Sequence, residues 1–160
     1  MEQLKKIFEE EIKIYQEILK LSKDKTDIVK ENRVSELETI TRSEEELIAN
    51  VIELEKKRIA KVKDICRQYG KEEKSLKIDE LCEFVTEGKE ELQSFKIEIT
   101  KILKELKKVN NLNDALIRNN LEYINFAVSI ATGAQKSNTI YEQKGKSNVK
   151  GYNNILDIKL

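Results

Sequence analysis

The chain has 160 residues, of which thirty are basic and thirty acidic, and it contains no histidine, proline or tryptophan. The missing histidine excludes Ser-His-Asp and Cys-His catalysis and imidazole metal sites. Zero net charge argues against a general nucleic-acid binder. No run approaches the ~18 apolar residues of a membrane span, and no apolar segment of a signal peptide follows the first residue. We therefore expect a cytoplasmic, helical protein of one domain that has a binding or structural role and uses no cofactor.

A first long helix is predicted over residues 2–31. Apolar residues recur there at spacings of three and four, which is the period of a helix rather than of a strand. Glu11 and Lys25 fall on this apolar stripe and interrupt it. Residues 32–34 mark a break, although a kink or a continuous helix is also compatible with the sequence.

A second long helix is predicted to end near Tyr69. Ser35 followed by Glu38 matches a capping box and places the start of this helix just after the break. Glu44 and Arg58 interrupt its apolar stripe. Gly70 then stands where a helix C-cap prefers glycine.

A short helix and a last long helix follow the charged turn at residues 71–74. The short helix places inward Leu76, Ile78, Leu81, Cys82 and Val85. The long helix is predicted over residues 89–131, between Gly88 and Gly133, with an unbroken heptad-like seam. That seam consists of Leu92, Phe95, Ile99, Ile102, Leu106, Val109, Asn113, Leu116, Asn120, Tyr123, Ala127 and Ile130.

The expected architecture is all-α. Three main helices with one stripe each, plus the short helix, form an elongated antiparallel bundle over residues 1–133. Residues 134–160 contain five lysines and two acidic residues, so they carry +3 and the bundle carries −3. We expect these last residues to form a flexible tail.

Two clusters have a chemical and a structural interpretation. The acidic run 44–46 is either part of a carboxylate metal site or, as we favour, a solvated helix face. Cys66 and Cys82 are either a redox pair or, as we favour, small packing residues. Without histidine, a carboxylate-bundle enzyme is disfavoured.

The most informative region is 109–135, and within it segment 123–135 has no charge in a chain that is 38% charged. Its apolar residues surround the helix, so it is either covered on all sides or presents an exposed apolar patch. Asn113 and Asn120 stand seven apart on the seam. They either fix the helix register or bond the backbone of a bound segment.

Several stretches resemble the FlgN-type flagellar export chaperones. Residues 36–48 follow Leu-x-x-Ile-x-x-x-Glu-Glu-x-Leu and residues 54–58 follow Leu-Glu-x-x-Arg, as in the second helix of that family. Residues 112–124 are similar to its Asn-x-x-Leu-(Leu/Ile) helix, and residues 139–145 to its Thr-x-Tyr-x-x-x-Gly tail. The resemblance covers most of the chain in the family order.

The resemblance implies a cytoplasmic, non-enzymatic chaperone. It would bind C-terminal helical segments of hook-filament junction proteins, prevent their premature assembly and deliver them to the flagellar type III export gate. Gate docking falls around Tyr141 and Gly145, and the role of residues 146–160 is left open. A long-helix bundle can hold such a segment in a groove, with expected contacts from Asn113, Leu116, Ile117, Asn120, Tyr123, Ile124, Ala127 and Val128.

The alternative is a self-associating structural coiled-coil or bundle protein without an export role. In that case the uncharged segment 123–135 would be the seam of a homodimer. Neither interpretation involves nucleic acid or insertion into a membrane.

Overall fold

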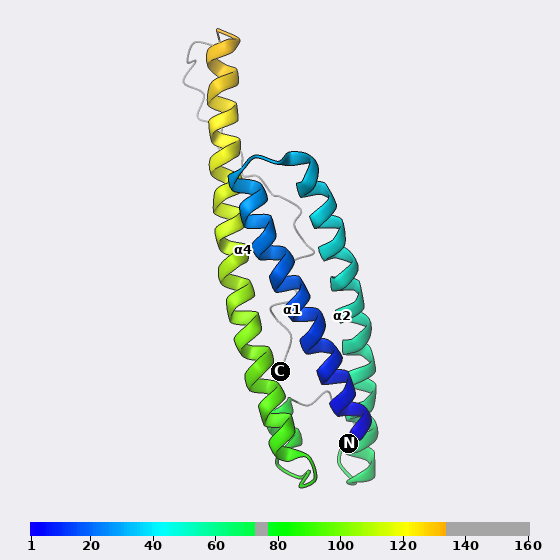
Figure 1. Cartoon of the computed structure of the whole chain (residues 1–160). Helices are drawn as coiled ribbons and strands as arrows, with labels where there is room; N and C mark the ends of the chain where they lie inside the picture. Colours follow the sequence, from blue (N-terminus) through cyan, green and yellow to red (C-terminus); the bar gives the residue numbers. More distant parts are fainter. Residues whose placement is uncertain (73–76, 134–160) are drawn as a thin grey trace.

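The computed structural model describes residues 1–72 and 77–133, and within these ranges the chain is helical and has no strand (Figure 1). The all-α prediction is therefore confirmed. Three long helices and one short helix are present in the described part of the chain: α1 Glu2–Lys30, α2 Val34–Gln68, α3 Ile78–Leu81 and α4 Lys89–Ala131. The tail predicted over 134–160 lies outside the described residues.

The central helix of the bundle is α1, which packs against both α2 and α4 (Figure 1). Consecutive long helices run in opposite directions, so α1 and α4 are parallel. At the end of the bundle where α4 begins, Lys5 forms an ion pair with Glu91 at 2.7 Å. At the opposite end of the α1–α4 contact, Asn120 Nδ2 donates to the Val29 carbonyl at 3.0 Å. Because α1 ends at Lys30, residues 121–131 of α4 extend beyond it.

Helix length explains this overhang. With a rise of 1.5 Å per residue, the 43 residues of α4 span about 64 Å, whereas the 29 residues of α1 span about 43 Å. Figure 1 shows the last turns of α4 standing above the α1–α2 connection. One end of the bundle is therefore a single helix.

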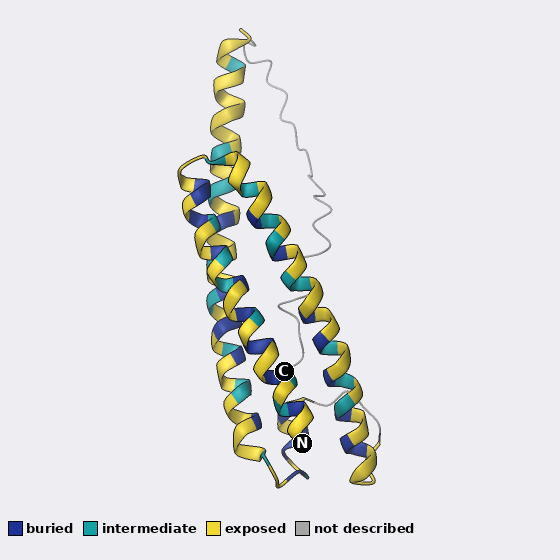
Figure 2. Cartoon of the chain, turned by 45° about the vertical axis from the view of Figure 1, so that its right-hand side comes forward, coloured by how far each residue is buried: buried dark blue, intermediate teal, exposed yellow. Residues whose placement is uncertain are grey.

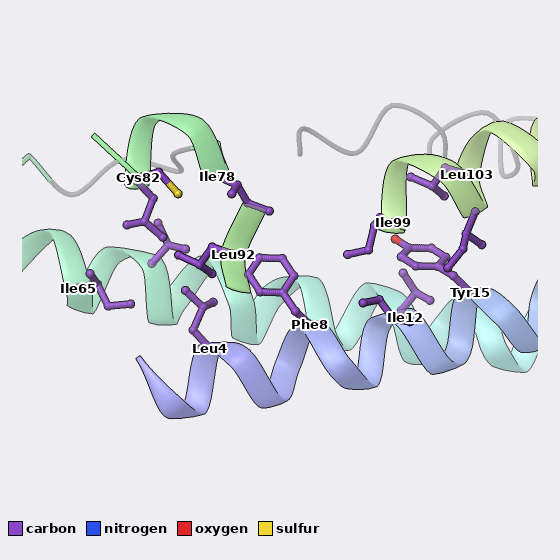
Figure 3. Packing of buried hydrophobic residues seen from close by; sticks show 14 of the residues in the cluster. Leu4, Phe8, Ile12, Tyr15, Ile65, Ile78, Cys82, Leu92, Ile99 and Leu103 are labelled. Carbon is purple, nitrogen blue, oxygen red and sulfur yellow. The ribbon is translucent and has the colours of Figure 1, made fainter. Parts of the chain in front are cut away.

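The hydrophobic core fills the lower and middle parts of the bundle. Figure 3 shows Leu4 and Phe8 of α1 pointing toward Leu92 of α4 and the α3 region. The Phe8 ring stacks on Phe95 with centroids 5.7 Å apart. Among the inward residues predicted for the short helix, Ile78, Leu81, Cys82 and Val85 are buried, and Leu76 lies outside the described residues.

The break between the first two helices is real. Asn32 has a φ of 54°, a left-handed conformation that a continuous helix cannot contain. The predicted capping box at Ser35 is wrong, because α2 begins at Val34 and Arg33 is its N-cap, without a side-chain cap. The Arg33 carbonyl accepts the amides of Glu36 and Leu37, at 3.1 and 3.3 Å. Ser35 therefore lies inside the first turn.

Four charged residues interrupt the predicted apolar stripes, and the structure pairs them across α1 and α2. The Arg58 Nε donates to Glu11 Oε1 at 3.1 Å, with both side chains buried. Lys25 forms an ion pair with Glu44, which also accepts the Ser22 hydroxyl at 3.0 Å. The solvated-face prediction for residues 44–46 is thus wrong for Glu44, because its position faces α1.

The two cysteines pack as small apolar residues. Both thiols are free and both side chains belong to the buried core, where Cys66 has an exposed fraction of 0% and Cys82 of 4%. Burial raises the pKa of the Cys82 thiol, which disfavours the reactive thiolate. These observations support the packing interpretation over the redox pair.

In the described part of the chain, no helix combines the length and the apolar character that crossing a bilayer requires.

Candidate partner-binding surface

The overhanging part of α4, residues 121–131, is exposed although it is rich in apolar residues. We refer to it as the apolar end of α4. Its exposed fractions are 54% for Leu121, 73% for Tyr123, 52% for Ile124, 63% for Phe126, 54% for Val128 and 65% for Ile130. Figure 2 shows this part of the helix almost entirely in the colour of exposed residues. Large contiguous apolar patches on a protein surface often mark interaction sites.

The seam predicted along α4 changes character near Asn120. N-terminal to this residue the seam faces α1 and is largely buried, with Leu92, Ile99, Ile102 and Leu106 in the core. The predicted seam positions Tyr123, Ala127 and Ile130 are instead exposed. The heptad spacing continues in α4 after α1 has ended at Lys30, so these seam positions have no partner helix beside them.

Between the two possibilities for segment 123–135, the described residues favour the exposed patch. Neither α1 nor α2 covers the apolar end of α4 (Figure 1). The covered alternative requires the first helix and the tail to surround this segment, and residues 134–160 lie outside the described residues.

The two seam asparagines tie α4 to the last turns of α1. The side chain of Asn113 is 3% exposed; its Nδ2 donates to the Ser22 carbonyl at 2.8 Å and its Oδ1 accepts the Thr26 hydroxyl at 2.6 Å. Asn120 Nδ2 donates to the Val29 carbonyl and to Asn32 Oδ1, both at 3.0 Å. These are the bonds that the register interpretation predicts, so both amides help to set where α4 leaves the bundle.

Replacement of Asn113 is expected to lower stability. Asn113→Ala removes one amide donor and one acceptor, and it leaves the Thr26 hydroxyl without this buried partner. The expected loss is about 1–3 kcal/mol in the free energy of unfolding, measured by urea denaturation. The exposed Asn119 on the same helix is the matched control, and Asn119→Ala is expected to change stability by less than about 0.5 kcal/mol. Equal effects of the two substitutions would contradict the register role.

A small apolar groove adjoins the apolar end of α4. Its cavity of about 110 Å³ lies where the α1–α2 connection meets α4. It is lined by Ile28, Val29, Asn32, Arg33, Val34, Leu37, Ile117, Asn120 and Leu121. Val34 is 73% exposed at its rim. The contribution of α1 and α2 was not predicted, because only the fold brings residues 28–37 beside residues 117–121.

The expected contact residues divide into three groups. Asn113 is buried in the bundle, and half-buried positions at its upper end are held by Leu116, Ile117 and Asn120. Exposed positions on the overhang are held by Tyr123, Ile124, Ala127 and Val128. Tyr141 and Gly145, the residues expected at the export gate, lie outside the described residues. Sequence reasoning omitted Leu121, Phe126 and Ile130, whose exposed fractions equal or exceed that of Ile124.

In residues 1–72 and 77–133 no group of three or more Cys, Asp or Glu side chains is arranged to hold a metal ion. The apolar end of α4 instead suits contact with another polypeptide, because most of its exposed side chains are apolar.

Comparison with known proteins identifies the family of this chain. Neither the curated proteins nor the solved structures include a significant match to this chain. The model of one protein family, described as FlgN protein, matches residues 1–148. Since this match spans the whole bundle and extends past Gly145, the chain belongs to the FlgN family, whose members serve as chaperones in flagellum biogenesis.

Proposed function

We propose that this chain is a cytoplasmic chaperone that binds the C-terminal helical segments of hook-filament junction proteins. The observation that supports it most is the exposed apolar end of α4, residues 121–131, next to the apolar groove at the α1–α2 connection. A family of flagellar chaperones needs a surface for export substrates, and this surface is the largest group of exposed apolar side chains in the described residues.

The mode of binding would be helix in groove. A junction-protein segment has an apolar face that would otherwise self-assemble, and α4 offers a complementary face. The expected contacts are Leu116, Ile117, Tyr123, Ile124, Ala127 and Val128, with Asn120 at the edge of the groove. While this face of the segment is covered, premature polymerisation is blocked. The protein uses no catalytic group or cofactor in this role.

Titration calorimetry with the full chain and a junction protein's C-terminal segment tests the proposal. The expected result is 1:1 binding with a Kd in the micromolar range or tighter, which corresponds to about −8 kcal/mol. Absence of heat together with absence of co-elution would contradict it.

Ile124 and Ile97 provide a matched pair for this titration. Both are exposed isoleucines on α4, at 52% and 70%, but Ile97 lies far from the apolar end. Ile124→Asp places a charge in the proposed contact and is expected to weaken binding at least tenfold, whereas Ile97→Asp leaves the Kd unchanged. If both substitutions weaken binding equally, the contact is not at the apolar end.

Delivery to the export gate is assigned to Tyr141 and Gly145 by the family resemblance. Tyr141→Ala is expected to weaken capture of the gate protein and to spare the affinity for the junction-protein segment. Loss of both activities to the same extent would reject this division between the bundle and the tail.

A further inference from the structure

The apolar end of α4 carries apolar residues on two sides of the helix. With 100° of rotation per residue, Ile117, Leu121, Ile124 and Val128 share one side, which we call the groove face because Ile117 and Leu121 line the groove. Leu112, Tyr123, Phe126 and Ile130 share the other side, which we call the outer face. The mean directions of the two faces are roughly 155° apart at this rotation per residue.

Both faces are open; polar residues separate them on one side of the helix, and Ala127 lies between them on the other. On the groove face Leu121, Ile124 and Val128 are 52–54% exposed, and on the outer face Tyr123, Phe126 and Ile130 are 63–73% exposed. Glu122, Asn125 and Ser129 follow one another at helical spacing on the wider side between the two faces, so no apolar residue joins the faces there. A packed helix covers a stripe of about 100°, so a single straight helix covers one face and leaves the other in water.

We infer that the partner presents two helical segments, one on each face, so that they clasp the apolar end of α4 as a helical hairpin. This inference rests on the proposed function and adds the form of the substrate. From Tyr123 to Ala131 the helix has no charge, so the segment faces that contact it are apolar and uncharged. The segment on the groove face also places a side chain in the cavity between Leu37 and Leu121.

Interface size favours this occupant over a second copy of the chain. A specific interface needs about 800 Å² on each side. One face of the apolar end offers three large side chains above the bundle, each contributing on the order of 100 Å² when covered. Pairing of two copies through one face therefore buries less than half of the required area, and it leaves the second face exposed. Covering both faces and the groove brings the area close to that of a specific interface.

Two paired substitutions separate the faces. Ile124→Ser with Val128→Ser alters only the groove face, and Phe126→Ser with Ile130→Ser alters only the outer face. All four side chains are exposed, so the fold is expected to be unchanged, as circular dichroism can verify. The control pair is Ile52→Ser with Ile97→Ser, which alters apolar residues that are exposed elsewhere on α2 and α4.

The measurement is titration calorimetry of each variant with a junction protein's C-terminal segment that is long enough for two helices, and with its two halves. Each paired substitution is expected to weaken binding of the whole segment at least tenfold, and the control pair to leave it unchanged. Each half should bind at least tenfold more weakly than the whole and respond to one face only.

The outcomes separate this inference from the proposed function. If the wild-type chain binds the segment and only one face responds, the two-segment inference is wrong and the proposed function stands. If the wild-type chain does not bind the segment, the proposed function fails as well. A dimer of the chain alone in light scattering, dissociated by either paired substitution, would assign the surface to a second copy and overturn the inference.

Discussion

Arg58→Ala is expected to destabilise the folded chain by about 3–5 kcal/mol near pH 8, because it leaves the Glu11 carboxylate buried without its cation. Both side chains are nearly inaccessible, with exposed fractions of 6% and 3%. The guanidinium also lies 5.7 Å from the centroid of the Phe8 ring, so its removal opens a gap in the core. Urea denaturation monitored by circular dichroism measures the effect.

The pH dependence of this loss has a defined sign. Burial raises the pKa of Glu11 from its ordinary value of 4.5 to about 7, against the lowering effect of Arg58. Between these two values the folded chain retains a proton that the unfolded chain has released. The contribution of Glu11 to the free energy of unfolding therefore falls as the pH rises through this window. Removal of Arg58 raises this pKa further, so the deficit of Arg58→Ala is expected to be smaller near pH 5 than near pH 8.

Two controls distinguish the buried pair from a general effect of losing arginine. Arg42 lies on the same helix with its side chain 72% exposed, and Arg42→Ala is expected to cost less than about 1 kcal/mol. The double substitution Glu11→Leu with Arg58→Met replaces the pair by apolar groups and is expected to recover most of the stability. A double variant as unstable as Arg58→Ala would contradict the assignment of the loss to an unpaired carboxylate.

The sequence predicts the helices well because their ends and stripes are local properties. The range 89–131 expected for the last helix equals α4, with Gly88 and Gly133 in left-handed conformations just outside it. The sequence positions of the paired charges also indicate which residues face each other across α1 and α2. The pair Glu11–Arg58 and the pair Lys25–Glu44 share one midpoint in the sequence, between Val34 and Ser35 at the start of α2, as successive partners in an antiparallel hairpin do.

The candidate site was harder to predict, because it depends on where a neighbouring helix ends. Periodicity identifies the apolar side of α4 but does not state which residues have a partner helix beside them. Tyr123 and Ile130 thus continue the seam in the sequence and are exposed in the structure. The groove likewise depends on the placement of Val34 and Leu37 against Ile117, which only the folded bundle defines.

The second large effect is expected for Phe8→Ala, at about 3–5 kcal/mol in the free energy of unfolding. Phe8 is 1% exposed, stacks on Phe95 of α4 and lies beneath Arg58 of α2, so its ring joins all three long helices. Ile97→Ala removes a residue that is 70% exposed and is expected to change stability by less than about 0.5 kcal/mol. The measurement is again urea denaturation.

Phe8→Ala also tests whether stability and binding reside in different parts of the molecule. Phe8 lies near the end of the bundle where α4 begins, whereas the proposed binding surface lies at the opposite end of α4 (Figure 1). In conditions where the variant remains folded, its Kd for a junction-protein segment is therefore expected to equal that of the wild type. Because Phe8 contacts Arg58, the losses from Phe8→Ala and Arg58→Ala should not add. A weakened Kd in a fully folded Phe8→Ala variant would mean that binding depends on packing throughout the bundle and not on the apolar end alone.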